Sequence, residues 1–96
     1  MHPDKVDRRQ LNRLADLPNV GPAMVRDLQL IGIYRPDQLK RRCPLELYGA
    51  LCVISGTRHD PCVLDVFMSI TRFVNGAPPL PWWSYTAERK SRYGAL

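Results

Sequence analysis

One segment of the sequence, residues 60–76, constrains the fold more than any other. Asp60 precedes Pro61, an order typical of helix starts, where a carboxylate caps free N–H groups and proline fits the first turn. Apolar side chains then recur at helical spacing until the Asn75-Gly76 pair ends the pattern. These apolar residues are Val63, Val66, Phe67, Ile70 and Val74. We predict a helix over residues 61–74 as the central element of the core.

Helical patterns also occur earlier in the chain. Residues 5–16 carry apolar side chains on one stripe with arginines opposite, which predicts a first amphipathic helix. A second helix is predicted from Pro22 to a glycine stop at Gly32. A short third helix is predicted from Arg35, anchored to the core by Leu39.

A fourth helix is predicted from Pro44 to the turn at residues 55–57, with Leu47, Leu51 and Ile54 on its inner side. No segment alternates apolar and polar residues with the period of a strand, so the fold class is predicted to be all-α. A chain of 96 residues, 45% of them hydrophobic, can bury one modest core. We therefore expect a single compact five-helix domain.

The chain changes character after residue 76. Residues 77–81 contain three prolines and should be extended, because proline lacks a backbone donor and restricts the residue before it. Trp82, Trp83 and Tyr85 follow. We favour an interpretation in which their rings cover the open side of the core. Alternatively, the rings stack on exposed nucleic-acid bases, or one ring serves each role.

The domain organisation follows from this change. We expect a helical domain over residues 1–76 and a Pro/Trp-rich extension over residues 77–96, which packs on the domain or is partly mobile. The part of the extension that begins at Thr86 either forms a short basic helix or stays mobile.

The net charge is +5, and most of the basic residues lie in three clusters. Such a charge attracts polyanions at long range, but alone it governs steering and solubility and does not define a binding site. Each cluster is otherwise explained as a solvated helix surface. The clusters are Lys5, Arg8, Arg9 and Arg13, then Arg35, Lys40, Arg41 and Arg42, and finally Arg89, Lys90 and Arg92.

Three cysteines raise the question of a metal or thiol site. The chain has an odd number of cysteines, Cys43, Cys52 and Cys62, so we expect free thiols. No apolar run is long enough for a signal peptide or a membrane span. We therefore expect a cytoplasmic location and no membrane partner. With His59 the cysteines form a possible zinc set, but no Cys-x-x-Cys pair exists, and we predict no metal and no cofactor. A nucleophile site at His59, Asp60 and Cys62 would need the helix dipole to lower the thiol pKa. We expect no enzyme and no small-molecule substrate.

The turn before the second predicted helix, Leu-Pro-Asn-Val-Gly-Pro at residues 17–22, resembles that of helix-hairpin-helix proteins. The residues that carry the resemblance are Leu14, Leu17, Pro18, Val20, Gly21, Leu28, Gly32 and Ile33. The resemblance implies two closely packed helices whose turn holds a DNA phosphate through backbone N–H groups. A duplex held in this way is bound by its backbone and is not read by its bases.

The resemblance also assigns roles to individual atoms. The phosphate donors would be the backbone N–H groups of Asn19, Gly21 and Ala23. In some family members, loop carbonyls also hold a monovalent cation that bridges to the phosphate. Here these carbonyls would be those of Ala15, Leu17 and Val20.

Three positions depart from the family pattern. Asn19 replaces the usual first glycine, which is tolerable because asparagine accepts left-handed backbone angles. Val25 stands where a small alanine is usual. Ala23 lacks the usual lysine or arginine, so charge contacts must come from Arg13, Arg26 or another basic cluster.

A degenerate second hairpin is predicted at residues 51–57, before the helix that starts at Pro61. Paired hairpins imply a SAM-like five-helix unit with both turns on one side, where Arg58 would contact a neighbouring phosphate. Nearly the whole chain is also similar to the bacterial pathogenicity-locus family of small helix-hairpin-helix proteins, some of them labelled mitomycin-resistance proteins. The residues that carry this similarity run from Leu14 through Arg58 to Phe67 and on to residues 81–83 and 86–90.

Two functions follow as expectations. The first is a non-sequence-specific DNA-binding module that holds duplex or branched DNA by its backbone, in DNA repair or damage resistance. The alternative is a protein-interaction module whose contact surface includes Trp82 and Trp83.

Overall fold

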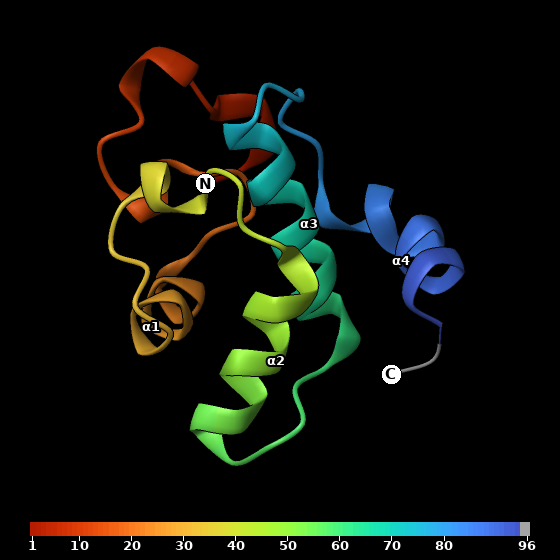
Figure 1. The fold of residues 1–96 in the computed structure, drawn as a ribbon. Coiled ribbons are helices and arrows are strands. Elements are labelled where there is room, and N and C mark those ends of the chain that lie inside the picture. The colour runs from red at the N-terminus through yellow and green to blue at the C-terminus, as the bar shows by residue number, and fades with distance from the viewer. Residues whose placement is uncertain (95–96) are drawn as a thin grey trace.

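The computed structural model describes residues 1–94, and all regular structure in this part of the chain is helical (Figure 1). The α-helices are α1 (Pro22–Leu30), α2 (Pro44–Ser55), α3 (Pro61–Val74) and α4 (Thr86–Tyr93). Short 3₁₀ turns cover Pro3–Lys5, Arg8–Gln10, Leu14–Asp16, Pro36–Leu39 and Trp82–Tyr85. The all-α prediction is confirmed, whereas the predicted count of five helices is replaced, within residues 1–94, by four α-helices and these turns.

The predicted helix over residues 5–16 is wrong. The Asp16 carboxylate accepts hydrogen bonds from the backbone N–H groups of Asn12 and Arg13, at 3.0 and 2.9 Å. Bonds of this kind from an aspartate to nearby backbone compete with helical hydrogen bonding. The segment therefore folds into short 3₁₀ turns and still buries Leu14.

The central element of the core is α3, as predicted. Asp60 caps it by accepting a hydrogen bond from the Cys62 N–H at 2.9 Å. Its inner face contains fully buried Leu64, Phe67 and Ile70. Both α2 and the Trp82–Tyr85 turn pack against α3, which runs through the middle of the molecule in Figure 1.

The predicted inner face of α2 is only partly correct. Leu47 and Leu51 are fully buried, but the side chain of Ile54 is 57% exposed. Figure 1 places the end of α2 at the tip of the molecule, where the chain reverses towards α3. The last turn of α2 therefore extends beyond its packing partners. It ends at Gly56, whose φ of 67° is left-handed, as expected for a helix stop.

The segment after α3 packs back on that helix. Asp65 of α3 is fully buried and accepts hydrogen bonds from Arg89 Nε at 2.8 Å and from Thr86 Oγ1 at 2.7 Å. Tyr85 is also buried. These contacts join α4 to the core. Within residues 1–94, no helix combines the length and apolar character needed to cross a membrane.

Candidate nucleic-acid interface

The turn at residues 17–22, called here the Asn19 turn, is fixed by its own side chains. Leu17 and Val20 are buried in the core on either side of Asn19. Asn19 has a φ of 66°, the left-handed conformation expected for the residue that replaces glycine. Gly21 has a φ of −105° and directly precedes α1. The turn therefore leads into a helix N-terminus from a rigid base.

Two of the three expected phosphate donors are available. Within residues 1–94, neither the Gly21 N–H nor the Ala23 N–H has a hydrogen-bond acceptor. The Asn19 N–H instead donates to the carbonyl of Met1 at 2.8 Å. In this conformation the donor set is therefore formed by Gly21 and Ala23, where the positive end of the α1 dipole favours an anion.

Two of the three carbonyls that the resemblance assigns to a cation, those of Leu17 and Val20, contact a different positive group. The Met1 ammonium donates to the carbonyl of Leu17 at 3.1 Å and to that of Val20 at 2.6 Å. Burial lowers the pKa of this amino group, while the charge of Asp16 acts in the opposite direction. The ammonium and the Met1 carbonyl together pin the N-terminal segment to the turn. No sequence pattern indicated this contact.

The Asn19 side chain explains why asparagine suits this turn. Its carboxamide donates to Ser69 Oγ at 3.0 Å and to the Leu80 carbonyl at 2.9 Å, and it accepts from the Trp82 N–H at 3.2 Å. Ser69 Oγ donates to the same Leu80 carbonyl at 2.9 Å. A glycine would provide the same backbone angle without these bonds. The residue that departs from the family pattern therefore ties the proline-rich segment to the turn.

A pocket of about 410 Å³ lies between the turn and the tryptophans. Residues that line it include Met1, His2, Asn19, Gly21, Trp82 and Trp83. The tryptophan rings are edge to face, with centroids 5.5 Å apart. Trp82 is half-buried, whereas 62% of Trp83 is exposed. The two rings thus differ in accessibility, and the more exposed one, that of Trp83, lines the same pocket as Gly21.

The predicted arginines do not gather around this pocket. Arg13 pairs with Asp16 at 3.6 Å and stays largely exposed. Arg26 lines a separate depression on α1 with Leu30 and Tyr34. Among residues 1–94, no arginine or lysine side chain lines the pocket at the Asn19 turn.

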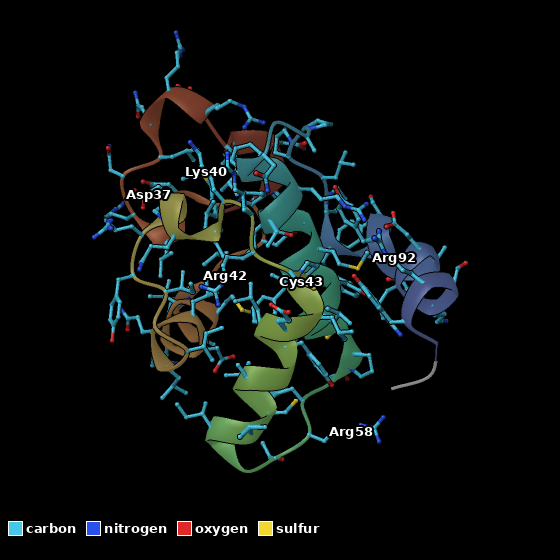
Figure 2. The ribbon with its side chains drawn as sticks, viewed as in Figure 1. Asp37, Lys40, Arg42, Cys43, Arg58 and Arg92 are labelled. Carbon is cyan, nitrogen blue, oxygen red and sulfur yellow. The ribbon has the colours of Figure 1, made fainter. Side chains whose placement is uncertain are left out.

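Arg58 lies at the far end of the molecule from the Asn19 turn. Figure 2 shows Arg58 beyond the end of α2, whereas the N-terminus, which bonds to the turn, lies near the opposite end of that helix in Figure 1. A 12-residue α-helix is about 18 Å long, which accounts for the separation. The expectation that both turns and Arg58 share one side is wrong.

The cysteine and histidine residues form neither of the sites considered from the sequence. Among residues 1–94, no cluster of three or more metal-binding side chains occurs. His59 Nε2 lies 2.8 Å from Ser55 Oγ. Burial raises the pKa of the Cys62 thiol, and the hydrogen bond and charge of Asp60 raise it further. The lowered pKa that the nucleophile hypothesis requires is therefore contradicted.

Comparisons with known proteins agree with the resemblance to the pathogenicity-locus family. A family model described as "Cdd1: Pathogenicity locus" matches residues 7–91. A Streptomyces lavendulae protein named "Mitomycin resistance protein McrB" is 46% identical over 77 residues, which cover 80% of this chain and 73% of that protein. No solved structure matches the chain.

Proposed function

We propose, for a chain that belongs to the pathogenicity-locus family, a role as a non-catalytic module that binds DNA through its sugar-phosphate backbone. The observation that carries this proposal is the pair of N–H donors at Gly21 and Ala23, which lack an acceptor within residues 1–94. Donors of this kind at a helix N-terminus suit a phosphate oxygen. Because they contact only the backbone of the nucleic acid, the module does not depend on base sequence.

The rigidity of the Asn19 turn supports the same proposal. Buried Leu17 and Val20 hold the turn from inside, and the Met1 and Asn19 hydrogen bonds hold it from outside. A preformed donor pair loses little conformational freedom when it binds an anion. The net charge of +5 adds long-range attraction to polyanions.

The name of the Streptomyces lavendulae relative refers to resistance to mitomycin. This name supports a role for the proposed module in damage resistance. Such a module would bind duplex or branched DNA without cleaving it, either alone or together with an enzyme that it recruits to the DNA.

A mobility-shift titration at low salt with a short duplex and a branched junction tests the proposal. Gly21→Glu is a suitable variant, because a Cβ at Gly21 meets no atom within 4 Å and its φ of −105° suits any residue. The added carboxylate would repel a phosphate, and binding should fall by at least about tenfold. Affinity for the native chain should also drop steeply as salt rises.

Gly49→Glu is the matched control. Gly49 is an exposed residue of α2, and a Cβ there also meets no atom within 4 Å. The control makes the same change of net charge away from the Asn19 turn. Equal weakening by both variants would show a general charge effect, and no DNA affinity of the native chain at low salt would refute the proposal.

A protein-interaction module is the second candidate function, and one observation favours it. Trp83 is 62% exposed, and Leu80 of the same segment is also partly exposed, so the segment presents apolar side chains to solvent. Under this alternative, Trp83→Ala should abolish capture of a protein partner from nuclease-treated lysate. Under the DNA-binding proposal, the captured material should be nucleic acid and should disappear after nuclease treatment.

A further inference from the structure

Three arginines from distant parts of the chain line one pocket. Arg42 lies just before α2, Arg72 on α3 and Arg92 on α4, and together they border a depression of about 330 Å³. Figure 2 shows Arg42, Cys43 and Arg92 across the middle of the molecule, where these elements meet. We call this depression the arginine pocket. It shares no lining residue with the pocket at the Asn19 turn.

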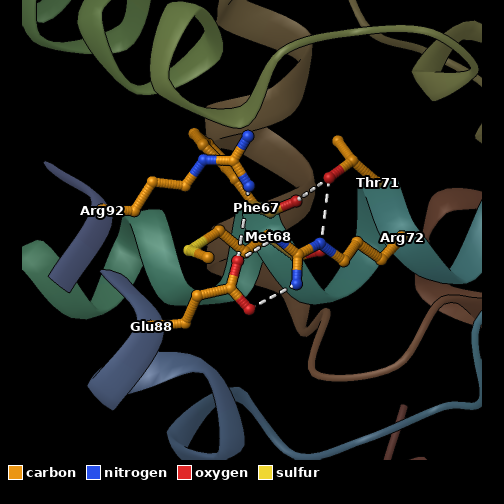
Figure 3. A network of polar contacts seen from close by, with 6 residues as sticks. All are labelled: Phe67, Met68, Thr71, Arg72, Glu88 and Arg92. Atoms are coloured by element: carbon orange, nitrogen blue, oxygen red, sulfur yellow. Dashed lines mark hydrogen bonds and ion pairs between the residues drawn. The ribbon is translucent and has the colours of Figure 1, made fainter. Parts of the chain in front are cut away.

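The positive charges of the arginine pocket exceed the negative charge that pairs with them. Glu88 accepts hydrogen bonds from both terminal nitrogens of Arg72, one of them at 2.6 Å, and also pairs with Arg92 at 3.5 Å (Figure 3). The Arg42 guanidinium has no ion pair or side-chain hydrogen bond within residues 1–94. Arg72 and Arg92 therefore share one carboxylate and Arg42 has none, so the three guanidinium groups carry two more positive charges than Glu88 neutralises.

The guanidinium groups are also partly fixed in place. Arg72 lies over the Tyr85 ring at 5.4 Å, and Arg92 lies over the Tyr93 ring at 5.8 Å. Each guanidinium has five N–H donors, and Glu88 uses only some of those on Arg72 and Arg92. Their planar forks match the oxygens of a phosphate group. The start of α2, beside Cys43, faces the same pocket and adds a positive dipole end to the charge of the arginines.

We propose that the arginine pocket binds a phosphate group. The ligand chemistry is that of a phosphoryl oxyanion, carried either by a nucleic-acid backbone or by a free phosphorylated small molecule. The proposal is independent of DNA binding at the Asn19 turn, because neither Gly21 nor Ala23 contributes to this pocket.

The test compares the native chain with Arg42→Gln/Arg92→Gln. Both side chains are largely exposed, so the variant should keep its fold, which circular dichroism checks. Lys5→Gln/Lys90→Gln is the matched control, since it removes the same charge from exposed residues outside the pocket. If the double arginine variant unfolds, Arg42→Gln alone serves the same purpose, because it breaks no ion pair.

Two ligands distinguish the sources of the phosphate. Inorganic pyrophosphate and a short DNA duplex are each titrated into isotopically labelled protein, and amide shifts are followed. Pyrophosphate should shift the amides of Leu45 and Glu46 at the start of α2, and the arginine variant should bind it at least about tenfold more weakly than the control. This result supports a pocket for a free phosphorylated molecule.

A second pattern supports the nucleic-acid source. In this pattern pyrophosphate binds weakly, whereas duplex affinity falls in the arginine variant and not in the lysine control. If neither ligand distinguishes the arginine variant from the control, the proposal is overturned. Gly21→Glu, compared with Gly49→Glu, changes no residue that lines the arginine pocket, so loss of one site is separable from loss of the other.

Discussion

The side-chain carbonyl of Asn19 accepts a hydrogen bond from the backbone N–H of Trp82 at 3.2 Å, although 63 positions separate the two residues. The same carboxamide donates to Ser69 Oγ and to the Leu80 carbonyl. One side chain therefore joins the turn before α1, the middle of α3 and the proline-rich segment. The next residue after Trp82, Trp83, lines the same pocket as Gly21.

Asn19→Gly should loosen the tryptophan segment while it preserves the turn. Glycine adopts the φ of 66° without strain, but three side-chain hydrogen bonds are lost. We expect the free energy of unfolding to fall by about 1–3 kcal/mol. We also expect the tryptophan fluorescence emission to shift to longer wavelength, because the Trp82 ring becomes more exposed to water. Urea titration followed by fluorescence measures both effects.

Asn12→Gly is the control for this change, because Asn12 is exposed and its side chain makes no hydrogen bond within residues 1–94. It should leave the tryptophan emission unchanged. If Asn19→Gly left both stability and emission unchanged, the Asn19 carboxamide would not hold the segment.

Asp65→Ala should be strongly destabilising. Asp65 is fully buried and pairs with the buried guanidinium of Arg89, which would lose its carboxylate. Removal of one partner from a buried ion pair typically costs about 3–5 kcal/mol. Thermal or urea unfolding measures the loss, and Glu46→Ala at an exposed position of α2 should change stability by less than about 0.5 kcal/mol. Similar stability of the two variants would contradict a structural role for the pair.

The Arg72–Glu88 ion pair should make stability depend on pH in the acid range. The hydrogen bond from Arg72 lowers the pKa of Glu88, so its ionised form stabilises the fold above the unfolded pKa. That contribution is lost as pH falls from about 5 to about 3. Because Glu88 is 40% exposed, we expect less than about 1 kcal/mol.

Glu88→Gln isolates this contribution. The difference in unfolding free energy between the native chain and the variant should be largest above about pH 5 and should shrink in acid. Urea titrations at several pH values measure it. A difference that is constant with pH, or that grows in acid, would show that Glu88 is not the group responsible.

Cys62 should react slowly with iodoacetamide at neutral pH. Burial and Asp60 raise the pKa of its thiol, so little reactive thiolate is present. Mass-spectrometric peptide mapping after timed labelling distinguishes Cys62 from Cys43 and Cys52 without substitution. The rate at Cys62 should rise when the chain is unfolded in urea, and folded-state labelling faster than a free thiol would restore the nucleophile hypothesis.

Elements with strong local signals could be predicted from the sequence. Asp60 and Pro61 mark the start of α3, and Gly32 and Gly56 mark the ends of α1 and α2, because capping and left-handed angles depend on neighbouring residues. The prediction of a helix over residues 5–16 was also wrong for a local reason. It relied on the spacing of apolar residues and did not consider that the Asp16 carboxylate can accept hydrogen bonds from nearby backbone N–H groups.

The set of residues that meet at the candidate site was less predictable from the sequence. The Asn19 turn and its backbone donors follow from a short motif, but its contacts with Met1 and Leu80 depend on how distant segments pack. The convergence of Arg42, Arg72 and Arg92 has the same origin, because they lie on separate elements. The separation of Arg58 from the Asn19 turn depends on the length of α2. A resemblance between two short turns carries no information about the length of that helix.

The most direct measurement of the central claim is backbone amide shift mapping as a short duplex is added at low salt. DNA binding through the Asn19 turn predicts that the Gly21 and Ala23 amides shift early and that high salt reverses the shifts. Unchanged amides across residues 17–23, with no shifts anywhere or shifts confined to other segments, would contradict it.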